Sequence, residues 1–317
     1  MYIGLEIGGT KCAVTLADTK GNILKKIRFA TEGAKETQEA LLRAAEELSE
    51  GEKILAVGVS CGSPLDSEKG LILSPPNLPG WDNVPITQMV EERLGVPAFL
   101  CNDANACALA EWKYGAGQGT RHMIFLTFGT GFGAGLILDG RLYEGRDGMA
   151  GEIGHVALAD FGPVGYGRPG AAEGYCSGGG IAQLGQIYAR AAIQRGEPAA
   201  FCPTLDDLSS VTAQSIAAAA DGGDAVAKEV YRVSGEKLGH ALGILIDLFN
   251  PECIVIGSVF KRAEHLLRPA MEESLAKSGI AASVKGCRIL PAVHDADLGD
   301  LAAIAIAAMG AEKRGLV

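Results

Sequence analysis

Apolar and polar positions alternate along the chain with two periods, and these periods separate predicted strands from predicted helices. Short apolar runs bounded by turn-forming residues predict strands. They cover residues 2–7, 11–17, 23–29, 54–61, 97–101, 123–128, 134–139, 253–257 and 288–291. Longer segments with helical spacing predict helices over residues 35–50, 85–94, 103–113, 179–193, 212–220, 224–249, 261–277 and 298–311.

The order of these elements indicates an α/β protein, because strands lead and helices then alternate with further strands. The opening unit of strand, Gly/Thr turn and strand recurs at residues 123–139, which predicts two lobes of related design. Gly115, Gly117 and Gly119 mark the expected boundary between them. Residues 62–84 predict a long structured loop, a type of segment that often carries function.

Composition adds an excess of glycine to this picture. The chain has 317 residues, of which 44 are Gly, about twice the share in an average protein. The glycines follow no three-residue period, which excludes collagen, and 48% apolar residues indicate a folded chain. The excess must therefore serve turns, close packing or backbone that approaches a ligand.

Charge and cysteine content restrict the class of partner. The net charge of −10 disfavours nonspecific binding to nucleic acid or to an anionic membrane. The apolar runs fall short of the roughly 20 residues that span a bilayer, and Glu6 in the first strand argues against a signal peptide. Eight scattered cysteines without a C-x-x-C pair are typical of reduced thiols, so we expect a cytoplasmic protein.

The first candidate site is the segment from Gly4 to Lys11. Gly8 and Gly9 permit the backbone to approach a phosphate, and Thr10 and Lys11 add a hydroxyl and a positive charge. Glu6 is placed to orient a metal-bound water. The alternative is an ordinary hairpin turn, in which Gly-Gly is common.

The second candidate site is the run from Leu126 to Gly135, in which every second residue from Gly129 onward is Gly. One face of this segment lacks side chains and suits a polyphosphate. It is neither a P-loop nor a dinucleotide-binding fingerprint, because a strand follows it instead of a helix. The alternative is close packing between sheet and helix.

Two further clusters contain polar side chains suited to a hydroxylated substrate. Asn102 and Asp103 lie where a buried strand meets a helix, so Asp103 is either a helix cap or a general base, with Asn102 orienting the substrate. Glu152, His155 and Glu173 suit hydrogen bonding to a polyol. For His155, a structural role or metal binding are the alternatives.

Together these segments resemble the ROK family of sugar kinases, which includes glucokinases, fructokinases and N-acetylhexosamine kinases. E-I-G-G-T-K is similar to the family's first phosphate loop and G-T-G-F-G-A-G to its second. P-N-L-P-G-W and N-D-A-N resemble its sugar-site segments, and G-M-A-G-E-I-G-H resembles its most diagnostic run. The matching segments follow the family order from Gly4 to about Leu301.

The resemblance implies a ribonuclease H-like fold of the actin and hexokinase type, with two lobes that hold ATP and sugar. Residues 1–116 with about 298–317 would form a smaller N-terminal lobe, and residues 117–297 a larger C-terminal lobe. Asp103 would be the base, and the sugar would be bound by Asn77, Asn102, Glu152, His155 and Glu173. The nucleotide would be bound by Gly8, Gly9, Thr10, Lys11, Thr130, Gly131, Gly133 and Gly257. Mg²⁺ would bridge the phosphates, with Glu6 holding it through water.

Two departures from the family pattern stand out. Glu6 occupies a position where many relatives have Asp. Most relatives also bind a structural zinc through C-x-C-G-x-x-G-C-x-E, and the three cysteine positions here are Val164, Tyr166 and Ala171. The resemblance therefore predicts no structural zinc, and His155 needs another partner to orient it.

The resemblance implies an ATP-dependent kinase that phosphorylates a hexose hydroxyl, with glucose as the first choice. N-acetylmannosamine, N-acetylglucosamine, allose and fructose are the alternative substrates. A different class is a non-catalytic sugar sensor, because some ROK proteins are repressors with an N-terminal helix-turn-helix. The first phosphate strand begins at Tyr2 and the chain is acidic, which disfavours a DNA-binding role. A homodimer is expected from the resemblance.

Overall fold

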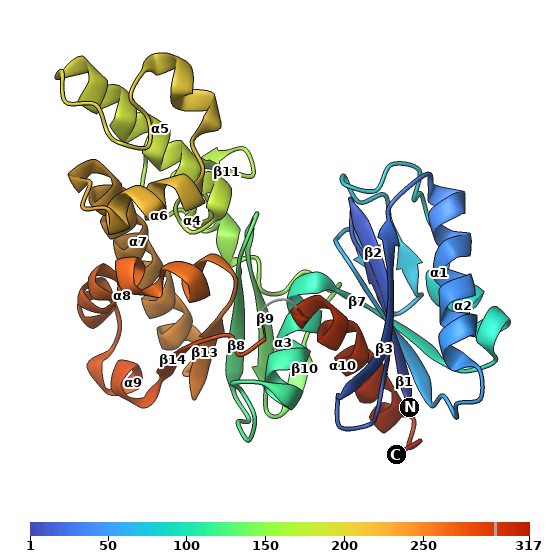
Figure 1. Ribbon diagram of the computed structural model, residues 1–317. Helices are drawn as coiled ribbons and strands as arrows, with labels where there is room; N and C mark the ends of the chain where they lie inside the picture. Colours follow the sequence, from blue (N-terminus) through green and yellow to red (C-terminus); the bar gives the residue numbers. More distant parts are fainter. Residues whose placement is uncertain (295–296) are drawn as a thin grey trace. The chain divides into compact units, whose positions relative to one another are not determined.

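The computed structural model describes residues 1–294 and 297–317, and the chain divides into two compact units (Figure 1). Unit 1 contains residues 1–121, 135–150 and 293–317, and unit 2 contains residues 122–134 and 151–292. The lobe limits that the resemblance implies stay a prediction. Residues 295 and 296, which it assigns to the C-terminal lobe, lie outside the described residues.

Unit 1 is built on a five-stranded sheet with the order β3-β2-β1-β4-β7. β2 pairs antiparallel with both β1 and β3, whereas β1, β4 and β7 are parallel. Ile7 aligns with Cys61, and Cys61 with Asn102, so the three parallel strands end at one edge. The strands are β1 Tyr2–Ile7, β2 Lys11–Ala17, β3 Ile23–Ala30, β4 Ala56–Cys61 and β7 Ala98–Asn102.

Helices cover both faces of this sheet. α1 (Ala34–Ser49) and α2 (Ile86–Leu94) pack on one face, and α10 (Leu298–Lys313) packs on the other (Figure 1). A side chain at Gly58 would overlap the backbone of α10, so glycine permits this close approach. β1 and β4 are covered on both faces of the sheet, and α10 is buried along most of its length. This burial explains why the three segments are apolar almost throughout.

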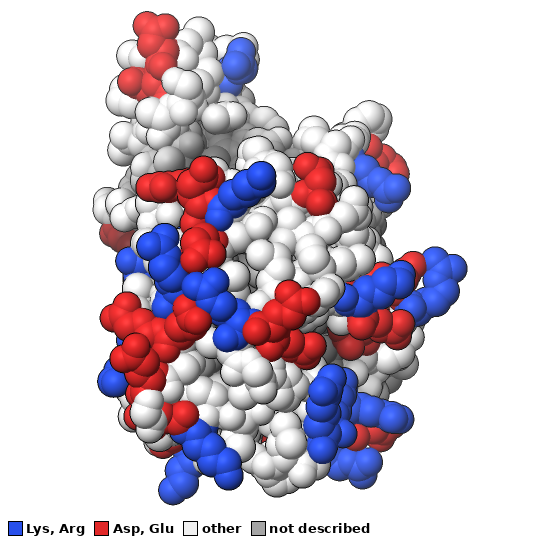
Figure 2. All heavy atoms as spheres, turned by 90° about the vertical axis from the view of Figure 1, so that its right-hand side faces the viewer, with Lys and Arg blue, Asp and Glu red and all other residues white. Residues whose placement is uncertain are grey.

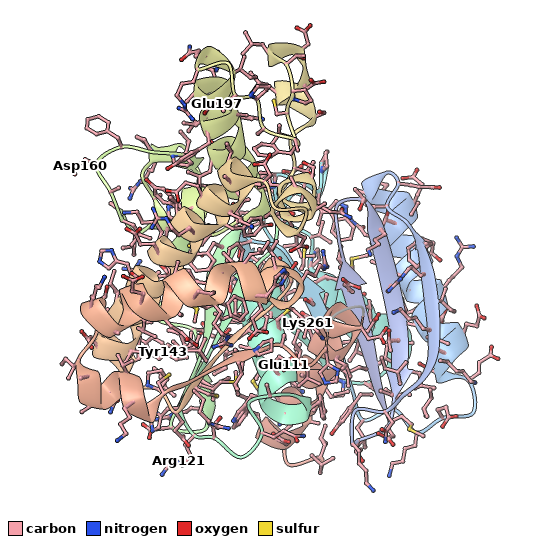
Figure 3. All side chains as sticks on the ribbon, turned by 60° about the vertical axis from the view of Figure 1, so that its left-hand side comes forward. Glu111, Arg121, Tyr143, Asp160, Glu197 and Lys261 are labelled. Atoms are coloured by element: carbon pink, nitrogen blue, oxygen red, sulfur yellow. The ribbon has the colours of Figure 1, made fainter. Side chains whose placement is uncertain are left out.

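A buried carboxylate fixes the end of α3 (Asp103–Tyr114) in unit 1. Glu111, labelled in Figure 3, accepts backbone N–H groups from Ala116 at 2.8 Å and from His294 at 3.0 Å. These bonds compensate for burying the charge. Glu111 is thereby a structural residue that joins α3 to the segment before α10.

The long loop predicted at 62–84 is ordered by its own apolar residues. It includes the two-residue strands β5 (Leu65–Asp66) and β6 (Leu71–Ile72), which pair with each other. Leu78 and Trp81 are buried in the core of unit 1 and anchor the loop. The prediction of a structured loop is therefore confirmed.

The second sheet has the order β10-β9-β8-β13-β14, and β8, β13 and β14 are parallel. Its strands are β8 Met123–Phe128, β9 Phe132–Leu138, β10 Arg141–Tyr143, β13 Cys253–Ile256 and β14 Arg288–Pro291. The helices of unit 2 are α4 Ala172–Tyr175, α5 Gly178–Gln194, α6 Ala213–Asp221, α7 Ala225–Phe249, α8 Val259–Ser278 and α9 Ala281–Gly286. Unit 2 also has the 3₁₀ turns η1 Ile153–His155 and η2 Leu205–Ser210, and a hairpin of β11 Val164–Gly165 and β12 Arg168–Pro169.

The predicted α/β architecture is confirmed, and the main differences are short elements. The hairpin β11–β12, α9 and β10 were not predicted, because they are too short to show a period. No helix in the described residues is long and apolar enough to cross a membrane. On the face shown in Figure 2, acidic and basic side chains are interleaved.

Candidate active site

The first Gly-rich turn of unit 1 is a hairpin connection between β1 and β2. The Gly8 N–H donates to the Lys11 carbonyl at 3.2 Å, and the Thr31 hydroxyl donates to the Gly8 carbonyl at 2.6 Å. The side chains of Thr10 and Lys11 are exposed. The turn thus has the hairpin geometry that was the alternative to a phosphate-binding loop. It also presents a hydroxyl and an ammonium group to solvent.

Asn77 lies against this turn. A Cβ atom at Gly9 would lie 2.6 Å from the Asn77 carbonyl oxygen, which is closer than such atoms approach. The neighbouring Leu78 and Trp81 are buried, while Asn77 itself is exposed. The structure therefore brings the P-N-L-P-G-W segment beside the first Gly-rich turn.

Asn102 and Asp103 divide two tasks at the start of α3. The Asn102 side-chain oxygen accepts the Asn105 N–H at 2.9 Å and caps the helix. Its amide nitrogen lies 3.4 Å from the Ser63 hydroxyl. Since Asn102 supplies the cap, the Asp103 carboxylate at the first helical position is not needed for that purpose.

The pKa of Asp103 is raised above its ordinary value. The side chain reaches solvent, yet protein atoms surround the carboxyl group and remove much of its water, which disfavours the charged form. The Ala104 N–H, which donates to the carboxylate at 2.8 Å, acts in the opposite direction. The net result is a carboxylate that is more basic than an ordinary Asp.

Glu6, at the end of β1, has a raised pKa through burial and through the nearby charge of Asp300. Asp300 is itself buried, accepts the Thr15 hydroxyl at 3.0 Å and pairs with Lys26. A side chain at Gly299 would overlap the Glu6 carboxylate, so α10 begins directly against it. The Glu6 carboxylate offers the oxygen ligands that Mg²⁺ prefers, so it fits an Mg²⁺ ion held through water.

In unit 2, the second Gly-rich loop follows β8 and is tied by short local bonds. The Gly129 N–H donates to the Gly131 carbonyl at 3.1 Å, and the Gly133 N–H donates to the Thr127 hydroxyl at 2.9 Å. The Thr130 side chain is exposed. The loop therefore presents backbone and one hydroxyl to solvent.

Gly257 and Ser258 lie beside this loop because β13 is parallel to β8. The Gly257 N–H donates to the Leu126 carbonyl at 3.0 Å, and a Cβ atom at Gly129 would lie 3.7 Å from the Ser258 hydroxyl oxygen. Ser258 has a φ of 53°, an uncommon value for a residue with a side chain. The sequence analysis missed Ser258, because a left-handed backbone at a non-glycine residue leaves no sequence signal.

The sugar-site segments of unit 2 pack directly on the second Gly-rich loop. The Glu173 carboxylate accepts the Phe132 N–H at 3.1 Å, and a Cβ atom at Gly131 would lie 2.9 Å from the same carboxylate. A side chain at Gly154 would overlap the Phe132 carbonyl. Glycine at positions 131 and 154 thus permits the close packing of these two segments.

His155 ends the turn η1, and Glu152, which directly precedes this turn, lies near its ring. The distance from His155 Nε2 to Glu152 Oε2 is 3.8 Å, which is too long for a hydrogen bond. The Tyr166 ring packs against the imidazole, with ring centroids 4.8 Å apart and ring planes inclined by 55°. The sequence analysis counted Tyr166 only as a lost cysteine and missed this contact.

The structure thus brings the expected site residues together in two groups, one in each unit. Unit 1 contains Glu6, Gly8, Gly9, Thr10, Lys11, Asn77, Asn102 and Asp103. Unit 2 contains Thr130, Gly131, Gly133, Glu152, His155, Glu173 and Gly257. Their roles toward sugar and nucleotide stay predictions.

The residues at the expected zinc positions do not fit a zinc ion. Val164 and Tyr166 lie in the hairpin β11–β12, Ala171 is buried, and none has a thiol or imidazole. Within residues 1–294 and 297–317, no group of three or more His, Cys, Asp or Glu side chains is arranged to hold a metal.

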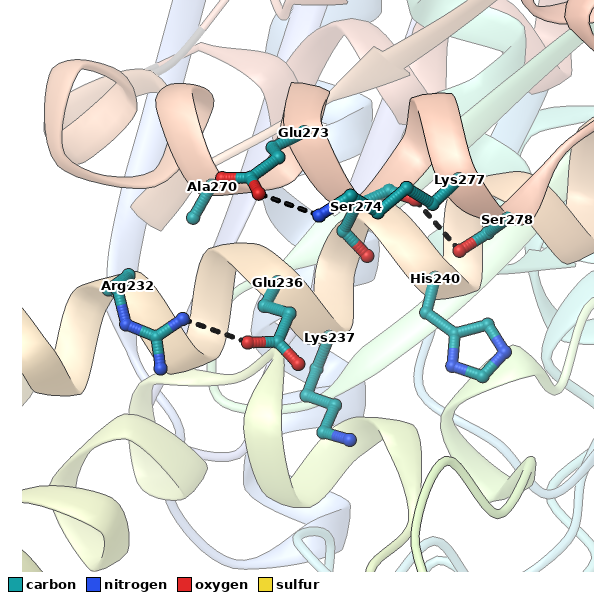
Figure 4. Close-up of a pocket in the computed structure, with 9 residues that line it drawn as sticks. All are labelled: Arg232, Glu236, Lys237, His240, Ala270, Glu273, Ser274, Lys277 and Ser278. Atoms are coloured by element: carbon teal, nitrogen blue, oxygen red, sulfur yellow. Dashed lines mark hydrogen bonds and ion pairs between the residues drawn. The ribbon is translucent and has the colours of Figure 1, made fainter.

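Two of the cavities among the described residues lie in unit 2. One, of about 300 Å³, lies between α7 and α8, and charged side chains that pair with each other line it, such as Arg232 with Glu236 (Figure 4). It contains none of the expected site residues. The other, of about 500 Å³, is lined by α6, α7 and the start of α8, including Val259, two residues after Gly257.

Comparison with known proteins decides the family. The family model described as "ROK family" matches residues 2–309. The chain belongs to the ROK family. The resemblance stated from its motifs is therefore confirmed, as is the fold that the family implies.

Named ROK relatives fall in two functional classes. A glucokinase from Thermotoga maritima is 34% identical over 277 residues, which cover 86% of each chain. An N-acetylglucosamine repressor from Escherichia coli is 31% identical over 86% of this chain and 67% of the repressor. A ROK glucokinase from Streptomyces griseus, solved in complex with glucose and AMPPNP, has a TM-score of 0.76 and 31% identity over 98% of this chain and 99% of that one.

Proposed function

We propose that this ROK protein is an ATP-dependent hexose kinase that transfers the γ-phosphoryl group of ATP to a hydroxyl of glucose. One observation carries the proposal. The Asp103 carboxyl has a raised pKa and is not needed as the helix cap, because Asn102 supplies the cap. It also lies at the strand edge where the first Gly-rich turn begins. The similarity to glucokinases supports the choice of reaction and substrate.

In this reaction Asp103 is the general base. Its carboxylate accepts the proton of the sugar hydroxyl while the hydroxyl oxygen attacks the γ-phosphorus. The raised pKa makes proton acceptance more favourable at neutral pH than for an ordinary Asp. The side-chain amides of Asn77 and Asn102 would orient neighbouring sugar hydroxyls.

The residues of unit 2 would bind the sugar and the phosphates as one block. Glu152, His155 and Glu173 offer acceptors and donors for sugar hydroxyls. The bond between Glu173 and the Phe132 N–H ties this set to the second Gly-rich loop. Backbone N–H groups at Thr130, Gly131 and Gly133 would hold phosphate oxygens, and in unit 1 the turn Gly8–Lys11 would have the same task.

Glu6 is the residue that would hold Mg²⁺ through water, and the ion when bound neutralises charge on the phosphates. The adenosine would lie in the cavity lined by α6, α7 and α8. Its lining combines small apolar residues of α6 with Tyr231 and Val259, and the chain enters it directly after Gly257 and Ser258. Such a mixed lining suits a flat base.

We also propose a homodimer located in the cytoplasm, with no nucleic-acid or membrane partner. The eight cysteines all lie in the described part of the chain and are free, which is typical of a reducing compartment. Net negative charge supports the absence of a nucleic-acid partner.

The similarity to a sugar-responsive repressor makes a non-catalytic sugar sensor the second candidate. Coupled detection of ADP over a panel of hexoses distinguishes the two. The panel contains glucose, fructose, allose, N-acetylglucosamine and N-acetylmannosamine. We expect hexose-dependent ADP formation, fastest with glucose. Saturable sugar binding without ADP formation from any of them would instead establish a sensor.

A further inference from the structure

The loop that replaces the zinc segment is folded by bonds within the protein. Its strands and flanks are joined by backbone bonds from Leu158 to Gly170 at 2.9 Å and from Gly170 to Pro163 at 3.0 Å. The Gln183 side chain of α5 both accepts the Val164 N–H, at 3.0 Å, and donates to the Val164 carbonyl, at 2.9 Å. Two hydrogen bonds therefore attach the hairpin to α5.

The hairpin turn holds Tyr166 in an unusual backbone conformation. Gly165 pairs with Arg168, so Tyr166 and Gly167 form a two-residue turn, with φ values of 45° and 77°. Positive φ at both positions is typical of a type I′ turn, where Asn-Gly is the preferred pair. A bulky aromatic residue at the first position is costly for the turn, so its presence requires another reason.

That reason is the ring contact with His155. The Tyr166 side chain is 75% exposed, so it is not there to fill a core, and its ring packs 4.8 Å from the imidazole. The base of the hairpin packs on Glu173, because a Cβ atom at Gly165 would lie 2.7 Å from the Glu173 Cβ atom. The hairpin therefore contacts two of the expected sugar-binding residues of unit 2.

We propose that Tyr166 is a positioning residue for sugar binding: its ring fixes the plane of the His155 imidazole, so that a ring nitrogen is presented to a sugar hydroxyl without a metal ion. The proposal rests on the hexose kinase function proposed above. Glu152 at 3.8 Å is too distant to fix the ring by a hydrogen bond, which leaves the tilted ring contact with Tyr166 to do so. The Tyr166 hydroxyl is not needed for this task.

Two substitutions distinguish the contribution of the Tyr166 ring from that of the turn conformation. Tyr166→Asn removes the ring and keeps the turn, because Asn tolerates positive φ. Tyr166→Phe keeps the ring and removes only the hydroxyl. Phe161→Ala is the matched control, since it removes another exposed aromatic ring (85% exposed) from the same loop.

The glucose dissociation constant is measured by calorimetry without nucleotide, and steady-state constants are measured with MgATP. We expect Tyr166→Asn to weaken glucose binding by about three- to tenfold, the usual range for one aromatic contact. The KM for ATP and kcat at saturating glucose should stay within about twofold. Tyr166→Phe should recover the affinity, and Phe161→Ala should match the wild type.

A spectroscopic measurement tests the same contact without substrate. In the chain with labelled histidines, the His155 ring resonance is assigned by its loss in His155→Gln. We expect it to shift in Tyr166→Asn and to remain in Tyr166→Phe, because the neighbouring ring current is lost only in the former.

Each contrary result has a distinct meaning. Wild-type glucose affinity in Tyr166→Asn, an unshifted His155 resonance, or equal weakening in Tyr166→Phe would overturn the role of the Tyr166 ring alone. A wild-type chain that neither binds nor phosphorylates any hexose of the panel would overturn the proposed function, and this proposal with it.

Discussion

At the scale of single residues, the start of α3 shows how two adjacent polar side chains acquire different chemistry. Asn102 uses its side-chain oxygen to cap the helix, whereas Asp103 is placed where protein atoms displace its water. Burial raises the pKa of the carboxyl, and backbone N–H groups, that of Ala104 first, offset the rise only in part. The same desolvation that disfavours the charge makes Asp103 a better proton acceptor.

The raised pKa of Asp103 leads to a prediction about pH. Only the ionised carboxylate accepts a proton, so kcat/KM should fall as pH drops through a value above 3.8, the ordinary pKa of Asp. Folding stability has the opposite sign: a raised folded-state pKa favours the protonated form, so this group stabilises the fold increasingly as pH falls through that interval. A profile of kcat/KM against pH checks the first point. An acid limb at or below the ordinary pKa would contradict it.

Part of the candidate site could be predicted from the sequence, and there is a physical reason why the rest could not. Asp103 and Asn102 were found because the strand-to-helix junction and the cluster of short polar residues are local features. Tyr166 and Ser258 were missed because their places beside the expected site residues depend on backbone conformation and on contacts that the sequence does not show. A missing thiol shows in the sequence, but the ring that takes its place near His155 does not.

At the scale of elements, agreement was best where the signal is local. The strands at 2–7, 11–17 and 123–128 match the prediction because each run ends directly before a turn-forming residue, namely Gly8, Asp18 and Gly129. β9 begins at Phe132, two residues before its predicted start, and the Gly133 N–H in this added part donates to the Thr127 hydroxyl. The hairpin β11–β12 was missed because its two-residue strands show no period and because tertiary bonds to α5 hold it.

The contact between Gly9 and Asn77 gives a prediction at this scale. Gly9→Ala places a methyl group 2.6 Å from the Asn77 carbonyl oxygen, so the turn and the P-N-L-P-G-W segment must move apart. Displacement of about 1 Å costs about 10²-fold in rate for a reaction that depends on positioning, so kcat/KM should fall by that order. Gly286→Ala, where a methyl group meets no atom within 4 Å, is the control and should keep full activity. Equal activity of the two variants would argue against a role for the turn.

At the scale of the whole molecule, both units have their expected site residues directly after the ends of parallel strands. In unit 1 the Gly-rich turn and Asp103 follow the ends of parallel β1 and β7, and in unit 2 the second loop and Gly257 follow parallel β8 and β13. The repeated plan was visible in the sequence as a recurring strand, Gly/Thr turn and strand. Glycine also permits close packing elsewhere in the sheet, as the overlap of a side chain at Gly58 with α10 shows.

The metal content of the whole chain is a further prediction. The loop around Tyr166 is held by its own hydrogen bonds and has no ligand at the three expected cysteine positions. Elemental analysis should therefore find zinc far below one ion per chain, and a chelator should leave the melting temperature unchanged. Stoichiometric zinc, or a lower melting temperature after chelation, would contradict this account of the loop.

The most direct measurement is ADP release from glucose and MgATP by the wild-type chain and by Asp103→Asn, side by side. Loss of a general base should lower kcat by about 10²- to 10⁴-fold, while calorimetry should show that glucose binding stays within about threefold. Asp206→Asn, at an exposed carboxylate of η2 in unit 2, is the control and should match the wild type. Equal rates of ADP release from wild type and Asp103→Asn would contradict the assignment of Asp103 as the base.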